Sequence, residues 1–396
     1  MNRNLNNLIP SGIRRFTNLA KAIPGCKMLT IGEPDLDTPQ PIRDAAARAL
    51  ADGLTHYAPN RGTDSLRKAI GEYETNRGMA ITPENVLVSI GATGALNTAL
   101  TGLLNPGDEL IIPTPAFSLY ESIALSVGAK PVFLDLSKTG FQIDETELAA
   151  LITPRTRAIV LNSPNNPTGA VLNQSSLDTV VRLTEGKDIY ILCDNVYAPL
   201  CDSPIPDLAL RPELRDRVIL CQSFSKPWAM TGWRIGYLAA PAALIEKFVL
   251  LQAAQIAAVP TFVQKAAETA LLTDVAPMSE IYARRRRYVE DRLKRMGLDF
   301  PTPEGAFYLP VRHGLRNLLH EAHSGGRRGL RSRVLLPGRR THPDLLLLLR
   351  QRAGGGPEPA GALPPASIIS SFNLAKEGNT LWQRSTRPSS RASVPP

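Results

Sequence analysis

The sequence predicts an α/β protein whose central sheet is mostly parallel and carries helices on both faces. Short apolar runs alternate with amphipathic segments from about residue 84 onward. Such runs fit strands that are buried on both faces, and the amphipathic segments between them fit the connecting helices. The chain has 396 residues, which is enough for two or three domains and a sizeable core.

The expected strands follow one another at 85–90, 109–112, 131–134, 158–161, 190–193, 218–221 and 235–238. Helical patterns lie between several of them, at 93–104, 175–184 and 243–257. A helix over 275–298 would lead out of this domain, and its run from Arg284 to Arg287 is typical of a solvated helix face. Ligands bind beyond the carboxyl ends of strands in such sheets, so the residues that follow these runs are the candidates for chemistry.

The net charge of +9 comes entirely from the end of the chain. Residues 311–396 contain 13 Arg and one Lys against four acidic residues, whereas residues 1–310 contain 31 basic and 32 acidic ones. The main body therefore gives no electrostatic reason to expect a nucleic-acid partner. The longest leucine run, 345–349, is too short to span a membrane. The N-terminus lacks the apolar core of a signal peptide, which favours the cytoplasm.

The cysteines predict reduced thiols rather than disulfides or a zinc site, because none has CxxC spacing. They are Cys26, Cys193, Cys201 and Cys221.

The sequence changes character after residue 310. Gly and Pro make up 19 of the last 86 residues, and stretches such as QRAGGGPEPAGALPP show neither strand nor helix periodicity, which predicts disorder. This change follows directly on the well-patterned PEGAFYL and indicates a shifted reading frame or a foreign tail. An uninterrupted frame shared with close relatives would contradict that hypothesis. His320 and His323 lie in this tail and are expected to be incidental rather than metal ligands.

The stretch SFSKPWAMTGWRIGYL, residues 223–238, carries the clearest chemistry. Lys226 follows an apolar run, and a lysine in a partly enclosed polar site can form a Schiff base with an aldehyde such as pyridoxal 5′-phosphate. Arg234 can meet the phosphate of this cofactor with a bidentate fork, and Ser223 and Ser225 can add hydroxyl donors. A lone lysine would be a surface residue, but the spacing S-x-S-K-x7-R is much more specific.

The cofactor ring has requirements of its own. Its pyridine nitrogen needs a carboxylate partner, and Asp194 follows the apolar run YILC, although an Asp there could also cap a helix. Tyr197 and Asn166 can donate hydrogen bonds to the phenolic oxygen, although NNPTG alone could be a simple turn. Phe117 can stack on the ring, although a single aromatic residue more often belongs to a core.

The phosphate also needs backbone donors. In SIGATGALNTAL, glycines lie between a strand and a helix, so the N–H groups of Ala92 and Thr93 can face an anion at the helix N-terminus. No Lys-Ser or Lys-Thr pair follows the second glycine, which excludes a Walker loop.

Together these segments resemble the class I aminotransferases, which are pyridoxal-phosphate enzymes of fold type I. The resemblance runs in order from about residue 10 to 309 through IGEPD, HYAPNRG, NNPTG, DNVY, SFSK, MTGWRIGYL and PEGAFYL. SGIRRF and LTIGEPDLDTP are most similar to the aspartate/aromatic subgroup. The nearest comparison is the bacterial aminotransferase A type, the N-acetyl-diaminopimelate aminotransferases.

The resemblance implies a role for each candidate residue. Lys226 would form the internal aldimine and shuttle the proton between the substrate Cα and the cofactor. Gly32 would contact the substrate carboxylate through its backbone, and Asn166 would also face the substrate. Tyr57 would reach the phosphate of a neighbouring subunit, which implies a homodimer. The remaining cofactor contacts would come from Ala92, Thr93, Phe117, Asn166, Asp194, Tyr197, Ser223, Ser225 and Arg234.

The resemblance also implies a division of the chain. Residues 1–40 would be an arm that joins the small domain, 41–285 the large cofactor-binding domain and 286–310 the start of a smaller α+β domain. Residues 311–396 would be an anomalous tail that leaves this small domain incomplete.

Two departures from the family matter. Asn195 stands where an acidic residue is usual, and the C-terminal strand that supplies a carboxylate-binding arginine is absent. The expected activity is transfer of an amino group between an L-amino acid and a 2-oxo acid. A C–S β-lyase on the same cofactor, or a catalytically impaired cofactor-binding protein, remain the alternatives.

Overall fold

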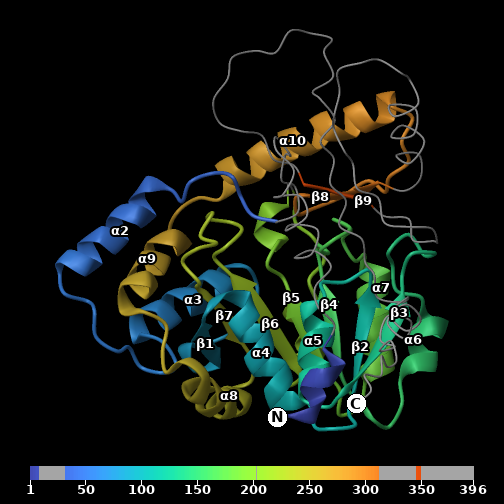
Figure 1. Cartoon of the computed structure of the whole chain (residues 1–396), viewed down its shortest axis with the longest axis horizontal. Helices are drawn as coiled ribbons and strands as arrows, with labels where there is room; N and C mark the ends of the chain where they lie inside the picture. The colour runs from blue at the N-terminus through green and yellow to red at the C-terminus, as the bar shows by residue number, and fades with distance from the viewer. Residues whose placement is uncertain (9–31, 202, 312–344, 349–396) are drawn as a thin grey trace, which may run out of the picture.

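The computed structural model describes residues 1–8, 32–201, 203–311 and 345–348 (Figure 1). Its main sheet has seven strands in the order β1-β7-β6-β5-β4-β2-β3. The strands are β1 Val86–Ser89, β2 Glu109–Thr114, β3 Lys130–Asp135, β4 Thr156–Asn162, β5 Tyr190–Asp194, β6 Val218–Ser223 and β7 Gly236–Ala239. Every strand expected from the sequence is present, with ends displaced by at most two residues.

The direction of the strands brings most of their carboxyl ends to one edge. Strands β6, β5, β4, β2 and β3 lie side by side in this order and pair in parallel with one another. β7 is antiparallel to both β1 and β6, so β1 runs in the same direction as the others. The last residues of β1, β4, β5 and β6 therefore lie at the same edge of the sheet, where the sequence predicts the chemistry.

The described helices flank this sheet and run out beyond it. They are α2 Gln40–Ala51, α3 Asp64–Asn76, α4 Gly91–Leu103, α5 Leu119–Ser126, α6 Glu145–Leu151, α7 Gln174–Thr184, α8 Ala242–Ile256, α9 Thr261–Leu271 and α10 Ala276–Arg295. Short 3-10 turns are η1 Arg3–Asn7, η2 Pro83–Asn85, η3 Ala198–Leu200, η4 Leu208–Leu210 and η5 Pro212–Leu214.

The core has two layers, one on each face of the sheet. Along β4, Ala158 and Val160 pack with α4, α5 and α8, whereas Ile159 and Leu161 pack with the apolar side of α7. This alternation follows from the two-residue period of a strand that is covered on both faces. A third cluster packs α3 and α9 over β1 and β7. The sequence prediction of a sheet covered on both faces is confirmed.

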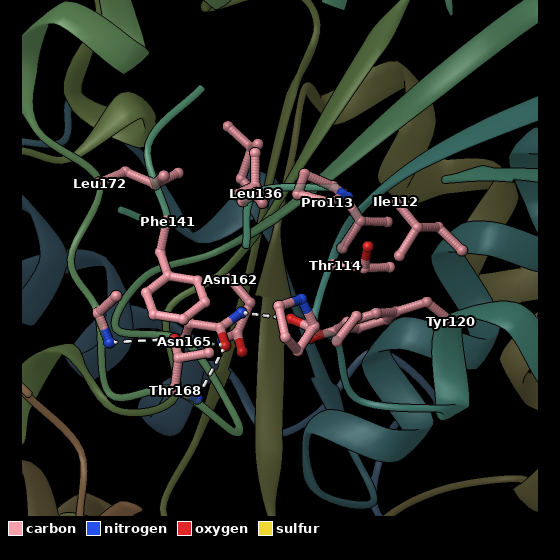
Figure 2. A pocket seen from close by; sticks show the side chains of 15 residues that line it. Ile112, Pro113, Thr114, Tyr120, Leu136, Phe141, Asn162, Asn165, Thr168 and Leu172 are labelled. Carbon is pink, nitrogen blue, oxygen red and sulfur yellow. Dashed lines mark hydrogen bonds between the residues drawn. The ribbon is translucent and has the colours of Figure 1, made fainter. Parts of the chain in front are cut away.

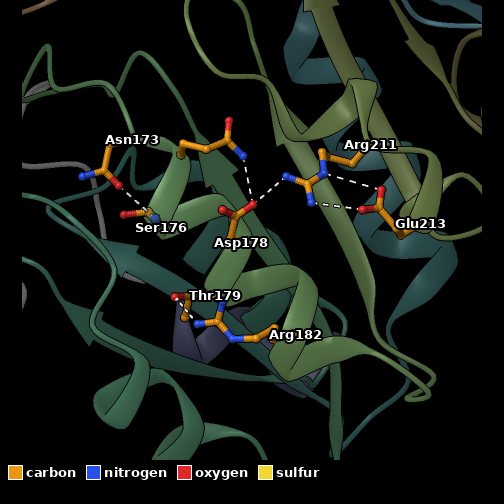
Figure 3. Close-up of polar contacts among 8 residues, drawn as sticks. Asn173, Ser176, Asp178, Thr179, Arg182, Arg211 and Glu213 are labelled. Atoms are coloured by element: carbon orange, nitrogen blue, oxygen red, sulfur yellow. Dashed lines mark hydrogen bonds and ion pairs between the residues drawn. The ribbon is translucent and has the colours of Figure 1, made fainter.

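Helix α7 is fixed by a capping hydrogen bond at its start and by an ion pair on its side (Figure 3). The Asn173 side chain accepts a hydrogen bond from the Ser176 N–H at 2.9 Å, which caps the first turn. Asp178 accepts from Arg211 at 2.6 Å, and Arg211 also pairs with Glu213 at 3.0 Å. The helix is thereby tied to the η5 region.

Two segments outside the main sheet belong to the expected N-terminal arm and to the expected small domain and tail. Asn4 in η1 donates to the Ser126 backbone oxygen at 3.3 Å, so this part of the arm lies against α5. β8, Tyr308–Val311, pairs antiparallel with β9, Leu345–Leu348. β9 lies in the tail but outside the stretches whose lack of periodicity predicts disorder, and a run of apolar residues can add to a strand edge by backbone pairing alone. The rest of the tail, like SGIRRF and Cys26, lies outside the described residues.

Helix α10 forms as expected, but its arginines do not all face solvent. Arg284 and Arg287 are exposed, whereas the side chains of Arg285 and Arg286 are 12% and 9% exposed. Each buried arginine has a carboxylate beside it, Asp35 for the first and Glu290 for the second, which makes the burial of a charge tolerable. The prediction of a fully solvated face is wrong for these two.

Candidate active site

The carboxyl ends of β4 and β5 are joined by side chains at the predicted edge. The Asn162 side chain, at the end of β4, donates to the Asp194 backbone oxygen at 2.8 Å. The Asn166 N–H in turn donates to the Asn162 Oδ1 at 2.7 Å. Asn166 and Asp194 are therefore held in one hydrogen-bonded group, as expected for two residues that would face the same ring.

Asp194 is a buried carboxylate with an aromatic partner. The Tyr120 hydroxyl donates to its Oδ2 at 2.6 Å, and the Val196 N–H approaches Oδ1 at 3.4 Å. Burial raises the pKa of Asp194 to about 6, although both hydrogen bonds and Lys226 oppose that rise. A cationic partner at this carboxylate would reverse the penalty of burial.

Sequence reasoning missed Tyr120. Its ring meets that of Phe117 edge to face, with centroids 5.9 Å apart. Phe117 is half-buried in the loop that follows β2, and Tyr120 lies in the first turn of the next helix, α5. The spacing of three residues between the two aromatics was the available signal.

Lys226 lies within the site rather than on the surface. Its Nζ donates to the Gly32 backbone oxygen at 2.5 Å and lies 5.7 Å from the centre of the Phe307 ring. Burial lowers the pKa of Lys226 to about 8; Glu33 and Asp194 oppose this shift, and Arg234 adds to it. A larger share of this amine is therefore neutral and nucleophilic near neutral pH than for an ordinary lysine.

Tyr197 and Tyr308 form a buried pair beside this lysine. Their hydroxyl oxygens lie 2.6 Å apart, and burial raises the pKa of both phenols well above the usual range. A Cβ atom on Gly32 would lie only 2.4 Å from the Tyr308 hydroxyl, so this position has room for glycine alone. The sequence marked PEGAFYL as a family segment but gave Tyr308 no role.

Arg234 faces the N-terminus of α4. Its guanidinium donates to the Thr231 and Ile90 backbone oxygens at 2.7 and 3.4 Å. Its own φ is +55°, a conformation that costs free energy in residues other than glycine and is found at functional sites. A Cβ atom on Gly91 would lie 2.7 Å from the Arg234 Nη2, so only glycine lets the arginine approach the helix end.

Hydroxyl and backbone donors surround this arginine. Ser223 donates to the Ser225 hydroxyl at 2.9 Å, and the backbone of Gly236 on β7 lies close to the N–H of Ala92. Thr93 is exposed and Ala92 half-buried in the first turn of α4, where helix N–H groups lack partners within the helix. This donor set fits a dianionic phosphate, and the neighbouring buried amine and carboxylate fit the aldehyde and pyridine ends of pyridoxal 5′-phosphate.

Tyr57 is the one candidate that the single chain does not bring into the site. It lies between α2 and α3 with its side chain 92% exposed. An aromatic side chain as exposed as this is left almost uncovered by the described residues of its own subunit.

A small cavity lies between the carboxyl ends of β2 and β4 (Figure 2). Its volume of about 20 Å³ has room for about one water molecule. Tyr120 and Asn162 line it, whereas Lys226 and Arg234 do not. The cavity is therefore not the place where a substrate would meet the lysine.

Within the described ranges, no group of three or more His, Cys, Asp or Glu side chains has the arrangement of a metal site. No helix among these residues combines the length and the apolar character that a membrane span needs.

Comparison with known proteins gives the family. The family model "Aminotransferase class I and II" matches residues 26–323. An aromatic-amino-acid aminotransferase of Thermococcus litoralis is 38% identical over 310 residues, covering 76% of this chain and 80% of the relative. The probable N-acetyl-LL-diaminopimelate aminotransferase of Bacillus subtilis is 36% identical over 304 residues, covering 76% and 77%.

Solved structures agree with these relatives. Aspartate aminotransferase of Thermotoga maritima superimposes with a TM-score of 0.77 at 33% identity and covers 81% of this chain and 89% of its own. The fold type I architecture that the sequence resemblance implied is confirmed. The family match extends to residue 323, somewhat beyond the point where the sequence alone changes character. This chain belongs to the class I and II aminotransferases, and it is a pyridoxal-phosphate-dependent aminotransferase.

Proposed function

We propose that the buried amine of Lys226 is the catalytic group with which this aminotransferase moves an amino group between an L-amino acid and a 2-oxo acid. The single observation that carries the proposal is the position of this amine. It is buried, its pKa is lowered to about 8, and Asp194 and Arg234 are both close enough to act on its charge. A buried lysine with this perturbation is typical of a catalytic lysine rather than a structural one.

The described residues supply a place for each end of the cofactor. Lys226 would hold it through Nζ, Arg234 with Ser223, Ser225, Ala92 and Thr93 would hold its phosphate, and Asp194 would face its pyridine nitrogen. When bound, pyridoxal 5′-phosphate supplies an electron sink for the negative charge that develops at the substrate Cα. Tyr197 and Asn166 would donate to its phenolic oxygen, and Phe117 would lie against the ring.

Lys226 would also move the proton. When the Lys226 Nζ is not attached to the cofactor, its pKa of about 8 would let it accept a proton from the substrate Cα. It would then pass this proton to the cofactor. Asp194 would stay ionised while it faces a protonated nitrogen, because an opposite charge lowers the pKa that burial alone raises. The Gly32 backbone, which already contacts Lys226, would face the substrate carboxylate.

The assembly and the compartment stay predictions from the sequence. A homodimer would explain the exposed Tyr57, since a second subunit could accept this ring at its own phosphate site. The arginine that would bind the substrate carboxylate has no candidate among the described residues.

A panel of amino donors tests the proposal on the full chain loaded with cofactor. Each L-amino acid is added alone, and the cofactor absorbance and the 2-oxo acid formed are measured. We expect at least one donor to yield its 2-oxo acid in an amount equal to the enzyme, and an added 2-oxo acid acceptor to restore the starting spectrum.

The other readings of the sequence predict different results in the same assay. A β-lyase would release ammonia and pyruvate from a sulfur amino acid over many turnovers without an acceptor. An impaired protein would bind cofactor and convert no donor. A version of the chain whose tail is replaced by the matching segment of a relative distinguishes two causes of inactivity. If this version converts a donor, the tail caused the inactivity; if it does not, the proposed site is wrong.

A further inference from the structure

The arginine run of α10 contains one side chain that reaches toward the catalytic lysine. Arg285 donates to Asp35 through both terminal guanidinium nitrogens, from Nη1 to Oδ1 at 2.7 Å and from Nη2 to Oδ2 at 3.3 Å. The two side chains are 12% and 9% exposed, so this pair is sheltered from solvent. Its neighbours Arg284 and Arg287 are exposed. A bidentate pair of this kind fixes orientation as well as distance.

Asp35 belongs to the segment that contacts Lys226. Three residues earlier, the Gly32 backbone oxygen accepts the Lys226 hydrogen bond. Three residues later, Thr38 donates to the Ala229 backbone oxygen at 2.8 Å and accepts from the Trp233 indole at 3.1 Å. The segment is thus anchored at Thr38 by the loop between β6 and β7, and at Asp35 by α10.

A second line of contact runs from the same arginine through aromatic rings. The Arg285 guanidinium lies 5.8 Å from the centre of the Tyr282 ring, and this ring lies 5.2 Å from that of Phe307. Phe307 in turn lies 5.7 Å from the Lys226 Nζ. Arg285 is therefore connected to Lys226 by two chains of contacts, one through the backbone of residue 32 and the other through packed aromatic rings.

Loss of the arginine would release this arrangement. A carboxylate that keeps its charge while buried without a partner is strongly unfavourable, so Asp35 would turn toward water. Among the described residues, the Arg285 Nε is buried with no hydrogen-bond partner, so the hydrogen bonds of this guanidinium go to the Asp35 carboxylate. Among the described residues, the segment would then keep its contacts at Thr38 and a long hydrogen bond from Thr231 to Glu33 at 3.5 Å, so Gly32 would be held less firmly against Lys226.

We propose that Arg285 is a positioning residue, which holds residues 32–36 through Asp35 so that the Gly32 carbonyl and the Phe307 ring enclose the Lys226 amine. The inference rests on Lys226 being the reactive lysine, as proposed above. The charged groups that act on this amine are Glu33, Asp194 and Arg234, and none of them is substituted in the test. Glu33 lies in the released segment and raises the pKa of the amine, so its withdrawal would reduce the expected rise, but burial is the larger effect.

The test measures the Lys226 amine in the cofactor-free full chain. An amine-acylating reagent is applied over a range of pH, and the labelling of the Lys226 peptide is quantified by mass spectrometry. In Arg285→Met we expect the midpoint of labelling to move up from about 8 by roughly one pH unit, because water regains access and burial no longer favours the neutral amine. Arg284→Met and Arg287→Met, which remove exposed arginines from the same helix, should leave the midpoint unchanged.

Two further variants keep the proposal open to refutation if Arg285→Met does not fold. Asp35→Asn keeps the shape of the side chain and should move the midpoint in the same direction. Arg285→Lys keeps the charge but loses the bidentate geometry, and should give a smaller shift. An arginine with a purely structural role would lower the thermal midpoint without moving the titration. An unchanged titration in Arg285→Met and Asp35→Asn would overturn the inference.

The outcome is separable from that of the proposed function. A wild-type midpoint near 8 that no variant moves contradicts the role of Arg285 alone. A shift in the variants, together with a wild-type enzyme that converts no amino donor, supports the role of Arg285 and contradicts the proposed activity alone.

Discussion

At the scale of residues, the site depends on buried groups whose charge is set by their partners. Asp194 and Lys226 are both shifted toward their neutral forms by burial, the first to a pKa of about 6 and the second to about 8. A cofactor that brings a protonated nitrogen to one and an aldehyde to the other would relieve both penalties. The two residues are thus prepared for a ligand that is large, flat and charged at both ends.

Tyr120→Phe should weaken cofactor binding without removing any direct contact that the sequence predicted. The lost hydrogen bond to Asp194 stabilises the ionised carboxylate, so its pKa should rise further. Hydrogen bonds to charged groups contribute about 1.5–3 kcal/mol, so the dissociation constant for cofactor should increase by roughly ten- to a hundredfold. Titration followed by cofactor absorbance measures this. Tyr190→Phe, at the opposite end of β5, is the matched control and should leave the affinity unchanged.

The rate at which cofactor becomes covalently attached should follow the titration of Lys226. Because the folded-state pKa is lowered to about 8, the amine is protonated and unreactive below that pH and neutral above it. The rate should therefore rise with pH and level off above about 8. Stopped-flow absorbance on cofactor-free protein gives the profile. A rate that keeps rising toward pH 10, as for an ordinary lysine, would show that the amine is not buried in solution.

At the scale of elements, the site depends on how closely β7 approaches β6 and the start of α4. A Cβ atom on Gly236 would lie 2.6 Å from the Gln222 oxygen and 2.8 Å from the carbonyl carbon of Gly91, both of them backbone atoms. Neither can move away without shifting a strand or a helix end. The register that pairs Ser223 with Gly236 therefore keeps Arg234 beside the N-terminus of α4, where we propose that the phosphate binds.

Gly236→Ala should separate β7 from the helix N-terminus. Overpacking of this kind costs about 1–3 kcal/mol of unfolding free energy, and cofactor retention should fall because Arg234 moves with the strand. Gly232→Ala is the matched control, because a Cβ atom there meets nothing within 4 Å, and it should stay within about 0.5 kcal/mol of wild type. Chemical denaturation and cofactor release after dilution measure the two effects. If the two variants were equal in unfolding free energy and in cofactor release, the close approach of β7 to β6 and to the start of α4 would be contradicted.

The elements themselves were largely predictable, and the exceptions have a physical cause. The seven strands are buried runs bounded by polar loops, so local pattern alone locates them. Arg285 and Arg286 look like their neighbours in sequence, and only the positions of Asp35 and Glu290 decide that they are buried. β9 was missed because its partner strand lies far away along the chain.

At the scale of the whole molecule, the exposed Tyr57 points to a second subunit. If the tyrosine serves its partner's phosphate site, Tyr57→Phe should weaken cofactor binding by about tenfold or more, since a hydrogen bond to a charged group is lost. A mixed dimer of a Tyr57→Phe subunit and a Lys226→Ala subunit should regain wild-type affinity at its one intact lysine. Co-expression with two tags and titration of the purified mixture tests this. A monomer, or a mixed dimer no better than Tyr57→Phe alone, would contradict it.

The sequence predicted those residues of the candidate site that lie at or just after the carboxyl end of a strand. Asn166 and Lys226 lie just beyond β4 and β6, and Asp194 is the last residue of β5, at the edge where a parallel sheet gathers its chemistry. Tyr120 and Tyr308 were missed because a tyrosine at the start of a helix or strand is usually a core residue. Their roles follow only from hydrogen bonds between segments that are distant in sequence, to Asp194 and Tyr197.

The most direct test of the central claim is to follow the amino group itself. The full chain, loaded with cofactor, is incubated with a ¹⁵N-labelled donor from the panel and an unlabelled 2-oxo acid, and the label is located by mass spectrometry. We predict that the label appears in the amino acid derived from the 2-oxo acid. Lys226→Ala should lower this transfer by about 10²–10⁴-fold, whereas exposed Lys247→Ala should not. Label found only as ammonia, or undiminished transfer in Lys226→Ala, would contradict the account.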